Sequence, residues 1–181
     1  MLEGIIHRTR SPGAHSTGKK GKIPCVLLAY FDCGVILRTL EGLVNLKDRL
    51  DVLLIENASP NSECMRQAMM RFVECGLISE YVFFKENISN NALNIILRNE
   101  ISCADHEFVI VSDGDLVSEG DAWLEESLDV MRLHQDVLCI GGSLDMSNLP
   151  LCTFPKAERW IPPDIADRGE YIHHVNCKNC Y

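Results

Sequence analysis

The sequence feature that most constrains the fold is an apolar run that ends abruptly in two carboxylates. Residues 108–112 read FVIVS, and Asp113, Gly114 and Asp115 follow directly. The short, β-branched run predicts a buried strand, and the glycine permits a sharp backbone turn. Open α/β sheets bind ligands at the carboxyl ends of their strands. We therefore expect both acids to lie at the ligand-binding edge of a sheet.

Apolar runs elsewhere in the chain alternate with helical patterns. Strands are predicted at residues 24–30, 51–55, 81–84, 107–112 and 137–140. The helical period between them is clearest at Met65, Met69, Phe72 and Val73. This alternation predicts an α/β fold, a three-layer α/β/α domain with a mostly parallel central sheet and a Rossmann-like nucleotide-binding half.

The charge distribution separates the chain into three segments. Residues 1–22 contain five Lys or Arg and one acid, without apolar periodicity, and are predicted to form a disordered basic tail. A basic arm for a membrane or nucleic acid is the alternative. The remainder holds 12 basic and 25 acidic residues, which argues against a nucleic-acid surface. The strand–helix pattern covers residues 23–149 and is lost in the proline-containing segment 150–181.

No membrane span or signal peptide is predicted, because no apolar run approaches about 18 residues. The chain has nine cysteines. Those inside apolar or helical patterns (Cys25, Cys75, Cys103 and Cys139) are predicted to be buried, reduced thiols. We therefore expect a reducing, cytoplasmic location.

Asp113 and Asp115 are the strongest candidates for chemistry. Two carboxylates at this spacing suit a hard divalent cation that shares its other positions with water and phosphate. In this interpretation Asp115 binds the metal directly, and Asp113 shares it through water or contacts the ribose of a nucleotide. The alternative is ordinary Asp-Gly-Asp turn chemistry.

The ends of the first two predicted strands carry candidate base-binding residues. Glu56 is suited to accept the ring N–H of a uracil, and the Asn57 amide is suited to another base edge. Ala29 and Tyr30 would flank the base. The alternatives are a strand-end turn before a helix cap for Glu56 and Asn57, and core packing for Ala29 and Tyr30.

An asparagine cluster precedes the third predicted helix and extends into it. It comprises Asn87, Asn90, Asn91 and Asn94, and Arg98 lies one turn after Asn94. Amides and a helix N-terminus suit diphosphate or sugar hydroxyls, and Arg98 offers positive charge. The alternative is plain turn and cap chemistry, with Arg98 paired to a surface acid.

The chain end holds residues of the zinc-ligand types. His174, Cys177 and Cys180 have regular spacing, and a fourth ligand would have to come from His173 or Cys152. Hydrolase, P-loop and dinucleotide glycine motifs are absent from the sequence.

Taken together, four segments resemble the GT-A glycosyltransferases, most closely the inverting family 2 group. They are residues 24–30, 54–59, 87–94 and 111–115. The first resembles the opening strand, the second the acid-Asn close of strand two, the third the Asn-rich segment, and the last the DxD motif. The resemblance covers residues 23–142.

The resemblance implies a nucleotide-sugar site. By position, Ala29 and Tyr30 line the nucleotide, Glu56 contacts the uracil ring, and Asp113 and Asp115 are the DxD acids. It further implies Mn²⁺ or Mg²⁺ as the cofactor, with Asp115 as the direct ligand, and a UDP-linked donor whose sugar passes to a hydroxyl acceptor.

The chain departs from the family beyond the acceptor segment. The family's general base is a downstream Asp or Glu, and Asp164, Asp167 and Glu170 match it only in residue type. Residues 150–181 are therefore predicted to be an abbreviated or truncated acceptor side, completed by a partner chain or a missing region. The alternative functions are a sugar-phosphate nucleotidyltransferase and a non-catalytic nucleotide-binding or scaffolding module.

Overall fold

The computed structural model describes residues 5–10, 21–30, 33–60, 62–99, 106–118 and 120–141. The chain divides into two compact units, Met1–Asp121 and Ala122–Tyr181. The first unit contains the sheet. The second contains helix α4 (Ala122–Leu133), in which Leu124 and Leu128 are buried one turn apart.

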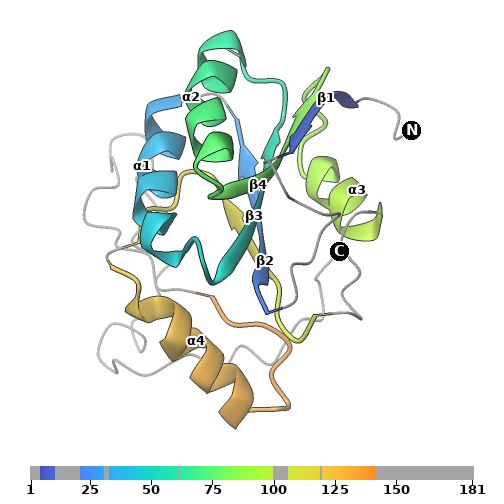
Figure 1. Ribbon diagram of the computed structural model, residues 1–181. Helices are drawn as coiled ribbons and strands as arrows, with labels where there is room; N and C mark the ends of the chain where they lie inside the picture. Colours follow the sequence, from blue (N-terminus) through green and yellow to red (C-terminus); the bar gives the residue numbers. More distant parts are fainter. Residues whose placement is uncertain are drawn as a thin grey trace, which may run out of the picture. The chain divides into compact units, whose positions relative to one another are not determined.

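The sheet of the first unit has five strands in the order β1-β4-β3-β2-β5 (Figure 1). Their bounds are β1 (Ile5–Arg10), β2 (Ile23–Ala29), β3 (Leu50–Glu56), β4 (Ile78–Phe84) and β5 (Ile110–Asp113). Strands β2 to β5 run parallel, and β1 pairs antiparallel with β4. The predicted mostly parallel sheet is confirmed.

Helices cover both faces of the sheet and complete three layers (Figure 1). Helix α1 (Cys33–Leu43), with the short 3₁₀ turn η1 (Val44–Leu46) after it, and helix α2 (Ser62–Glu74) lie on one face. Helix α3 (Asn91–Asn99) lies on the other. Beneath α3 the core combines Ala92 and Ile96 of the helix with Val26, Leu53, Ile55, Val82 and Phe84 of the strands. The apolar period of α2 is explained because Met65, Met69 and Val73 are buried.

The chain order creates a topological switch point beside β2. From β2 the chain proceeds outward to β3 and β4, and then crosses over through α3 to β5 on the other side of β2. Connections that leave neighbouring strands in opposite directions open a crevice at the carboxyl ends, where α/β proteins bind their ligands. The crevice expected from this order lies between the ends of β2 and β5.

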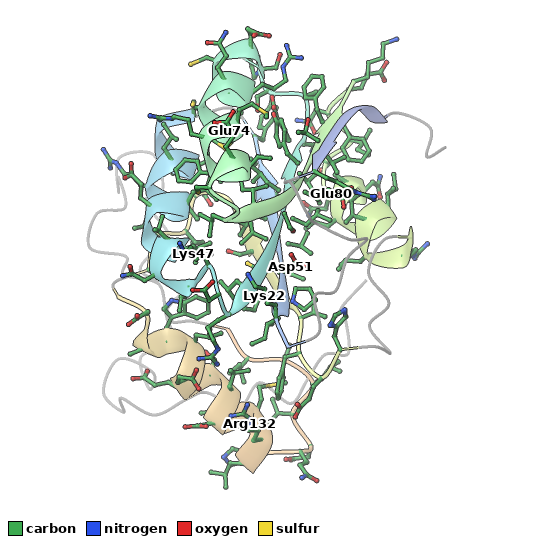
Figure 2. The ribbon with its side chains drawn as sticks, in the orientation of Figure 1. Lys22, Lys47, Asp51, Glu74, Glu80 and Arg132 are labelled. Atoms are coloured by element: carbon green, nitrogen blue, oxygen red, sulfur yellow. The ribbon has the colours of Figure 1, made fainter. Side chains whose placement is uncertain are left out.

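Strand β1 lies within the predicted disordered tail, so that prediction is wrong for Ile5–Arg10. Arg10 pairs with Glu80 in the strand register, and its Nε lies 3.4 Å from Glu80 Oε1. Glu80 is buried on β4 (labelled in Figure 2). The backbone groups along the edge of β4 gain partners in β1, a long-range contact that local composition does not contain.

Three further strand predictions need correction. The strand predicted to be buried over residues 107–112 is β5, which begins at Ile110 and is only partly buried, with Val111 47% exposed. Residues 137–140 form no strand: their backbone is irregular, Leu138 is 85% exposed, and they pair with none of the described strands. Strand β4 begins at Ile78, three residues before the predicted start, because its polar residues are paired. Ser79 Oγ donates to the Val52 carbonyl at 2.9 Å.

The cysteine predictions are confirmed only in part. Cys25 is buried in β2, and burial raises its pKa to about 12, so it is an inert thiol. Cys75 and Cys139 are exposed, contrary to the prediction. Cys103 lies outside the described residues.

Candidate functional site

Asp113 occupies the predicted edge of the sheet. It is the last residue of β5 and pairs with Leu28 near the end of β2. The next backbone N–H, that of Gly114, donates to the Leu28 carbonyl at 2.7 Å. The Asp-Gly-Asp turn is therefore attached to β2 at the switch point.

Gly114 lies in a space where a side chain would be crowded. A Cβ at this position would lie 2.7 Å from Ile36 Cδ1, 3.0 Å from the Leu28 carbonyl oxygen and 3.3 Å from Ala29 Cα. Thr39 Oγ1 on α1 also donates to the Gly114 carbonyl at 2.8 Å. The turn is thus held between β2 and α1, which explains why a glycine separates the two acids.

Both acids beside this buried glycine are exposed to solvent. Over the described ranges, no group of three or more His, Cys, Asp or Glu side chains could chelate a metal unaided. Mg²⁺-like ions are commonly held by one or two carboxylates, with waters and substrate phosphates completing the shell. Asp113 and Asp115 fit that donor set, and their role as metal ligands stays a prediction.

Ala29 and Tyr30 have different environments at the end of β2. Ala29 is buried, and its carbonyl accepts the Asn57 N–H at 2.9 Å. Tyr30 is 50% exposed just beyond the strand. Of the two, only Tyr30 has a side chain that a ligand at this edge can reach.

Glu56 at the end of β3 is fully buried. Its carboxylate accepts a hydrogen bond from the Tyr81 hydroxyl on β4. Burial raises the pKa of Glu56, and hydrogen bonds from Tyr81 and Ser59 and the positive charge of Arg66 oppose that effect. Burial, followed by Glu56 itself, raises the pKa of Tyr81. The predicted contact of Glu56 with a base therefore requires its neighbours to move.

The Asn57 side chain binds protein groups rather than facing a ligand. Its Nδ2 donates to Asn87 Oδ1 at 3.0 Å and to the Ser89 carbonyl at 3.1 Å, and its Oδ1 accepts from the Ile88 N–H at 2.9 Å. These bonds hold the loop between β4 and α3 against the end of β3. In this structure Asn57 is a structural residue, and its predicted nucleotide contact has no free donor hydrogen.

Asn94 and Arg98 lie on an exposed side of α3. They line an open groove of about 490 Å³ together with Ile88, Asn91 and Ile95. Asp113 and Asp115 are not among these lining residues. Asn94 and Arg98 therefore line the same groove, and this groove does not include Asp113 or Asp115.

Sequence reasoning missed two supporting residues. Thr39 interrupts the apolar face of α1 between the buried residues Ile36 and Leu43, and a lone hydroxyl on a core-facing helix stripe is the signal that would have identified it. Tyr81 lies on a buried strand, where a phenol needs a partner. The sequence around Tyr81 does not indicate that Glu56 is its partner, because the two residues lie on different strands.

Several predicted residues lie outside the described part of the chain. These are the general-base candidates Asp164, Asp167 and Glu170 and the zinc candidates His173, His174, Cys152, Cys177 and Cys180. Among the described helices, none is long and apolar enough to cross a membrane.

Comparison with solved structures supports a glycosyltransferase-like fold. The mannosyltransferase PcManGT from Pyrobaculum calidifontis, in complex with GDP-Man and Mn²⁺, aligns with a TM-score of 0.50 and 19% identity. The alignment covers 68% of this chain and 34% of the mannosyltransferase. At this identity the likeness establishes the fold and not the activity.

Sequence comparison finds relatives in Acanthamoeba polyphaga mimivirus, and no family model matches the chain. The uncharacterized protein L137 is 40% identical over 159 residues, which is 85% of this chain and 22% of L137. The uncharacterized protein L142 is 34% identical over 163 residues, covering 87% of this chain and 33% of L142. The chain thus spans a third or less of the length of these relatives.

Proposed function

We propose that this chain contains the donor-binding part of a glycosyltransferase, which moves a sugar from a nucleotide-diphosphate donor to a hydroxyl acceptor. One observation carries the proposal: two exposed carboxylates flank a glycine buried at the switch point of a mostly parallel sheet. The glycosyltransferase-like fold and the family 2 resemblance of the DxD segment support it.

Asp113 and Asp115 would hold Mn²⁺ or Mg²⁺, with Asp115 as the direct ligand. The metal would neutralise the negative charge that develops on the departing diphosphate. The Mn²⁺ in the complex of the structural neighbour supports this assignment. The exposed aspartates leave room for water and phosphate oxygens, which this small donor set requires.

The donor is proposed to be a nucleotide sugar, with UDP as the carrier suggested by the resemblance. The GDP-Man bound to the structural neighbour supports the donor class but has a different base. Tyr30 is exposed and would flank the base, and Glu56 would accept a base N–H. Asn94 and Arg98 are the candidates for more distant phosphate or sugar contacts.

The proposed reaction breaks the bond between the anomeric carbon and the diphosphate oxygen. The acceptor oxygen forms the new bond to that carbon, and a base takes the hydroxyl proton. If the reaction inverts the anomeric carbon, attack is in line with the departing diphosphate. Asp164, Asp167 and Glu170 remain base candidates, and a partner chain or a missing C-terminal region is the alternative source. A cytoplasmic location remains the prediction from the cysteines.

Titration calorimetry with UDP and Mn²⁺ tests the donor site. The wild type is expected to bind UDP more tightly with Mn²⁺ than without it. The Asp115→Asn substitution removes a charged ligand and should weaken the metal-dependent binding by about tenfold to a hundredfold.

The matched control is Asp48→Asn, which removes the same charge from an exposed turn. This turn precedes β3 and lies at the amino ends of the parallel strands, away from the acids. It should bind as the wild type does. Equal binding by wild type and Asp115→Asn would refute the metal site. Metal-dependent binding without donor hydrolysis or sugar transfer would instead favour a non-catalytic module. This alternative is considered because the chain covers only 22% of L137 and 33% of L142.

A further inference from the structure

The buried acid at the end of β3 is paired in an asymmetric way. Oε2 of Glu56 accepts the hydrogen bond from Tyr81. Oε1 is also buried and has no hydrogen bond of normal geometry among the described residues. A buried carboxylate oxygen without a donor is costly, and its retention calls for an explanation.

The location of Glu56 suggests what that donor is. Glu56 pairs with Ala29 in the β2–β3 register, so it lies beside the strand end that borders the switch point. Ser59 hydrogen-bonds the carboxyl through its side chain and its backbone, and Ala58 before it has φ +56°, which an alanine rarely adopts. Relaxation of this strained segment lowers the cost of moving Ser59 away from the acid.

We propose that Tyr81 is a positioning residue that sets the base preference of the donor site. Because the Tyr81 hydroxyl lies against Oε2, a base N–H would meet the carboxyl of Glu56 at Oε1 once Ser59 has moved away, which favours uracil over guanine. This inference rests on the proposed function. It assigns a role to a residue that touches no ligand itself.

The selectivity follows from the hydrogen-bonding edges of the two bases. Uracil has a single ring N–H between two carbonyl groups, whereas guanine has a ring N–H next to an amino group. Two adjacent guanine donors need both carboxylate oxygens side by side and facing the base, but here the Tyr81 hydroxyl lies against Oε2. The guanine amino group would then be buried unpaired, at a loss of about tenfold in affinity.

The same pair predicts how binding depends on pH. The groups that act on Glu56 are Tyr81 from β4, Arg66 from α2 and Ser59 from the β3–α2 loop, and Cys33 from α1 acts on Tyr81. The ionised carboxylate is the better acceptor, so uracil binding weakens as pH falls through the pKa of Glu56. The hydrogen bond from Tyr81 lowers the pKa of Glu56, so its loss raises that pKa. Uracil binding then begins to weaken at a higher pH.

Calorimetry on the 181-residue chain with Mn²⁺ and either UDP or GDP tests the proposal. The wild type should prefer UDP by about tenfold, and UDP methylated at ring N3 should bind about tenfold more weakly than UDP. Tyr81→Phe should bring the affinities for UDP and GDP closer together and move the pH midpoint of UDP binding upward. Glu56→Gln should abolish that midpoint, because an amide does not titrate.

The matched control is Ser79→Ala, which removes another side-chain hydroxyl linking β4 to β3, to the Val52 carbonyl. It should keep both the base preference and the pH midpoint. A wild type that prefers GDP, or that binds N3-methylated UDP as well as UDP, overturns the inference without any variant. So does a folded Tyr81→Phe variant with an unchanged preference and midpoint. Failure of the wild type to bind either nucleotide refutes the proposed function instead, so the two failures are distinguishable.

Discussion

The two strands that flank β2 both end in an acid, but the protein treats the two acids in opposite ways. Asp113 at the end of β5 is exposed, beside the glycine turn that β2 and α1 hold in place. Glu56 at the end of β3 is buried, and its carboxyl accepts hydrogen bonds from Tyr81 and Ser59. Asp113 at β5 is therefore open to a ligand, whereas at β3 the protein itself supplies the contacts of Glu56.

This difference shows that a position at the ligand-binding edge is not sufficient to identify a ligand-binding residue. Asn57 lies at the same edge as Asp113, yet both of its Nδ2 donor bonds go to the loop before α3. Exposure together with a rigid backbone distinguishes Asp113 and Asp115 from Asn57. The three substitutions that follow test this comparison.

The largest effect is expected for Gly114→Ala. The new methyl group would meet the Leu28 carbonyl and the Ile36 side chain, and the backbone oxygen cannot move without disturbing β2. Overpacking of this kind typically costs about 1–3 kcal/mol of unfolding free energy. Metal-dependent UDP binding should also weaken strongly, because both acids are attached to this residue. Denaturant unfolding and calorimetry measure the two effects.

Gly141→Ala is the matched control, because a Cβ there meets no atom within 4 Å. It should leave both unfolding and UDP binding nearly unchanged. If Gly114→Ala has the same free energy of unfolding and the same UDP affinity as Gly141→Ala, the turn is not held as tightly as its contacts indicate. Backbone rigidity then cannot distinguish the two strand ends.

A smaller loss is expected for Asn57→Ala. The substitution removes three side-chain hydrogen bonds and leaves the partly buried Ile88 N–H without its acceptor. Each hydrogen bond typically contributes about 0.5–1.5 kcal/mol net, so we expect the three together to lower the free energy of unfolding by about 2 kcal/mol. Hydrogen exchange at the Ile88 amide should accelerate. The control Glu86→Ala alters an exposed side chain of the same loop, away from the start of α3, and should change neither quantity.

UDP binding by Asn57→Ala sharpens the comparison. If Asn57 is structural, its loss should lower stability more than it lowers UDP affinity at saturating Mn²⁺. A large loss of affinity in a variant whose stability equals that of Glu86→Ala would show that the amide contacts the nucleotide, and the two strand ends would then share a ligand.

The fold could be predicted from the sequence because its signals are local. Apolar runs of strand length alternate with helical periods, and parallel strands covered on both faces leave a strong apolar pattern. The position of Asp113 followed from the same logic. Strand β1 could not be found this way, because its pairing with β4 joins Arg10 to Glu80 across 70 residues of sequence. The strand prediction for residues 137–140 was wrong for the converse reason, because an apolar run becomes a strand only when another strand pairs with it.

The candidate site was predictable in its exposed half and not in its buried half. Asp113, Gly114 and Asp115 are neighbours in sequence, so one short segment contains both acids and the turn. The environment of Glu56 depends on Tyr81, 25 residues later, and on Arg66 of α2. Contacts between separate elements of this kind have no periodic signature. The sequence identified the acid, but it could not indicate that a phenol holds it.

The smallest effect is expected for Thr39→Val, which tests how α1 supports the exposed acids. Valine keeps the shape of threonine but loses the hydrogen bond from Oγ1 to the Gly114 carbonyl at 2.8 Å. A net loss of about 1 kcal/mol in unfolding free energy is expected for one such bond. Thr39→Ser is the informative partner variant, because it retains the hydroxyl and loses only a methyl group. If α1 fixes the turn through this bond, UDP affinity with Mn²⁺ should fall in the valine variant and recover in the serine variant. Equal affinity in both would mean that packing of Ile36 and Leu28 around Gly114 positions the acids without the hydroxyl.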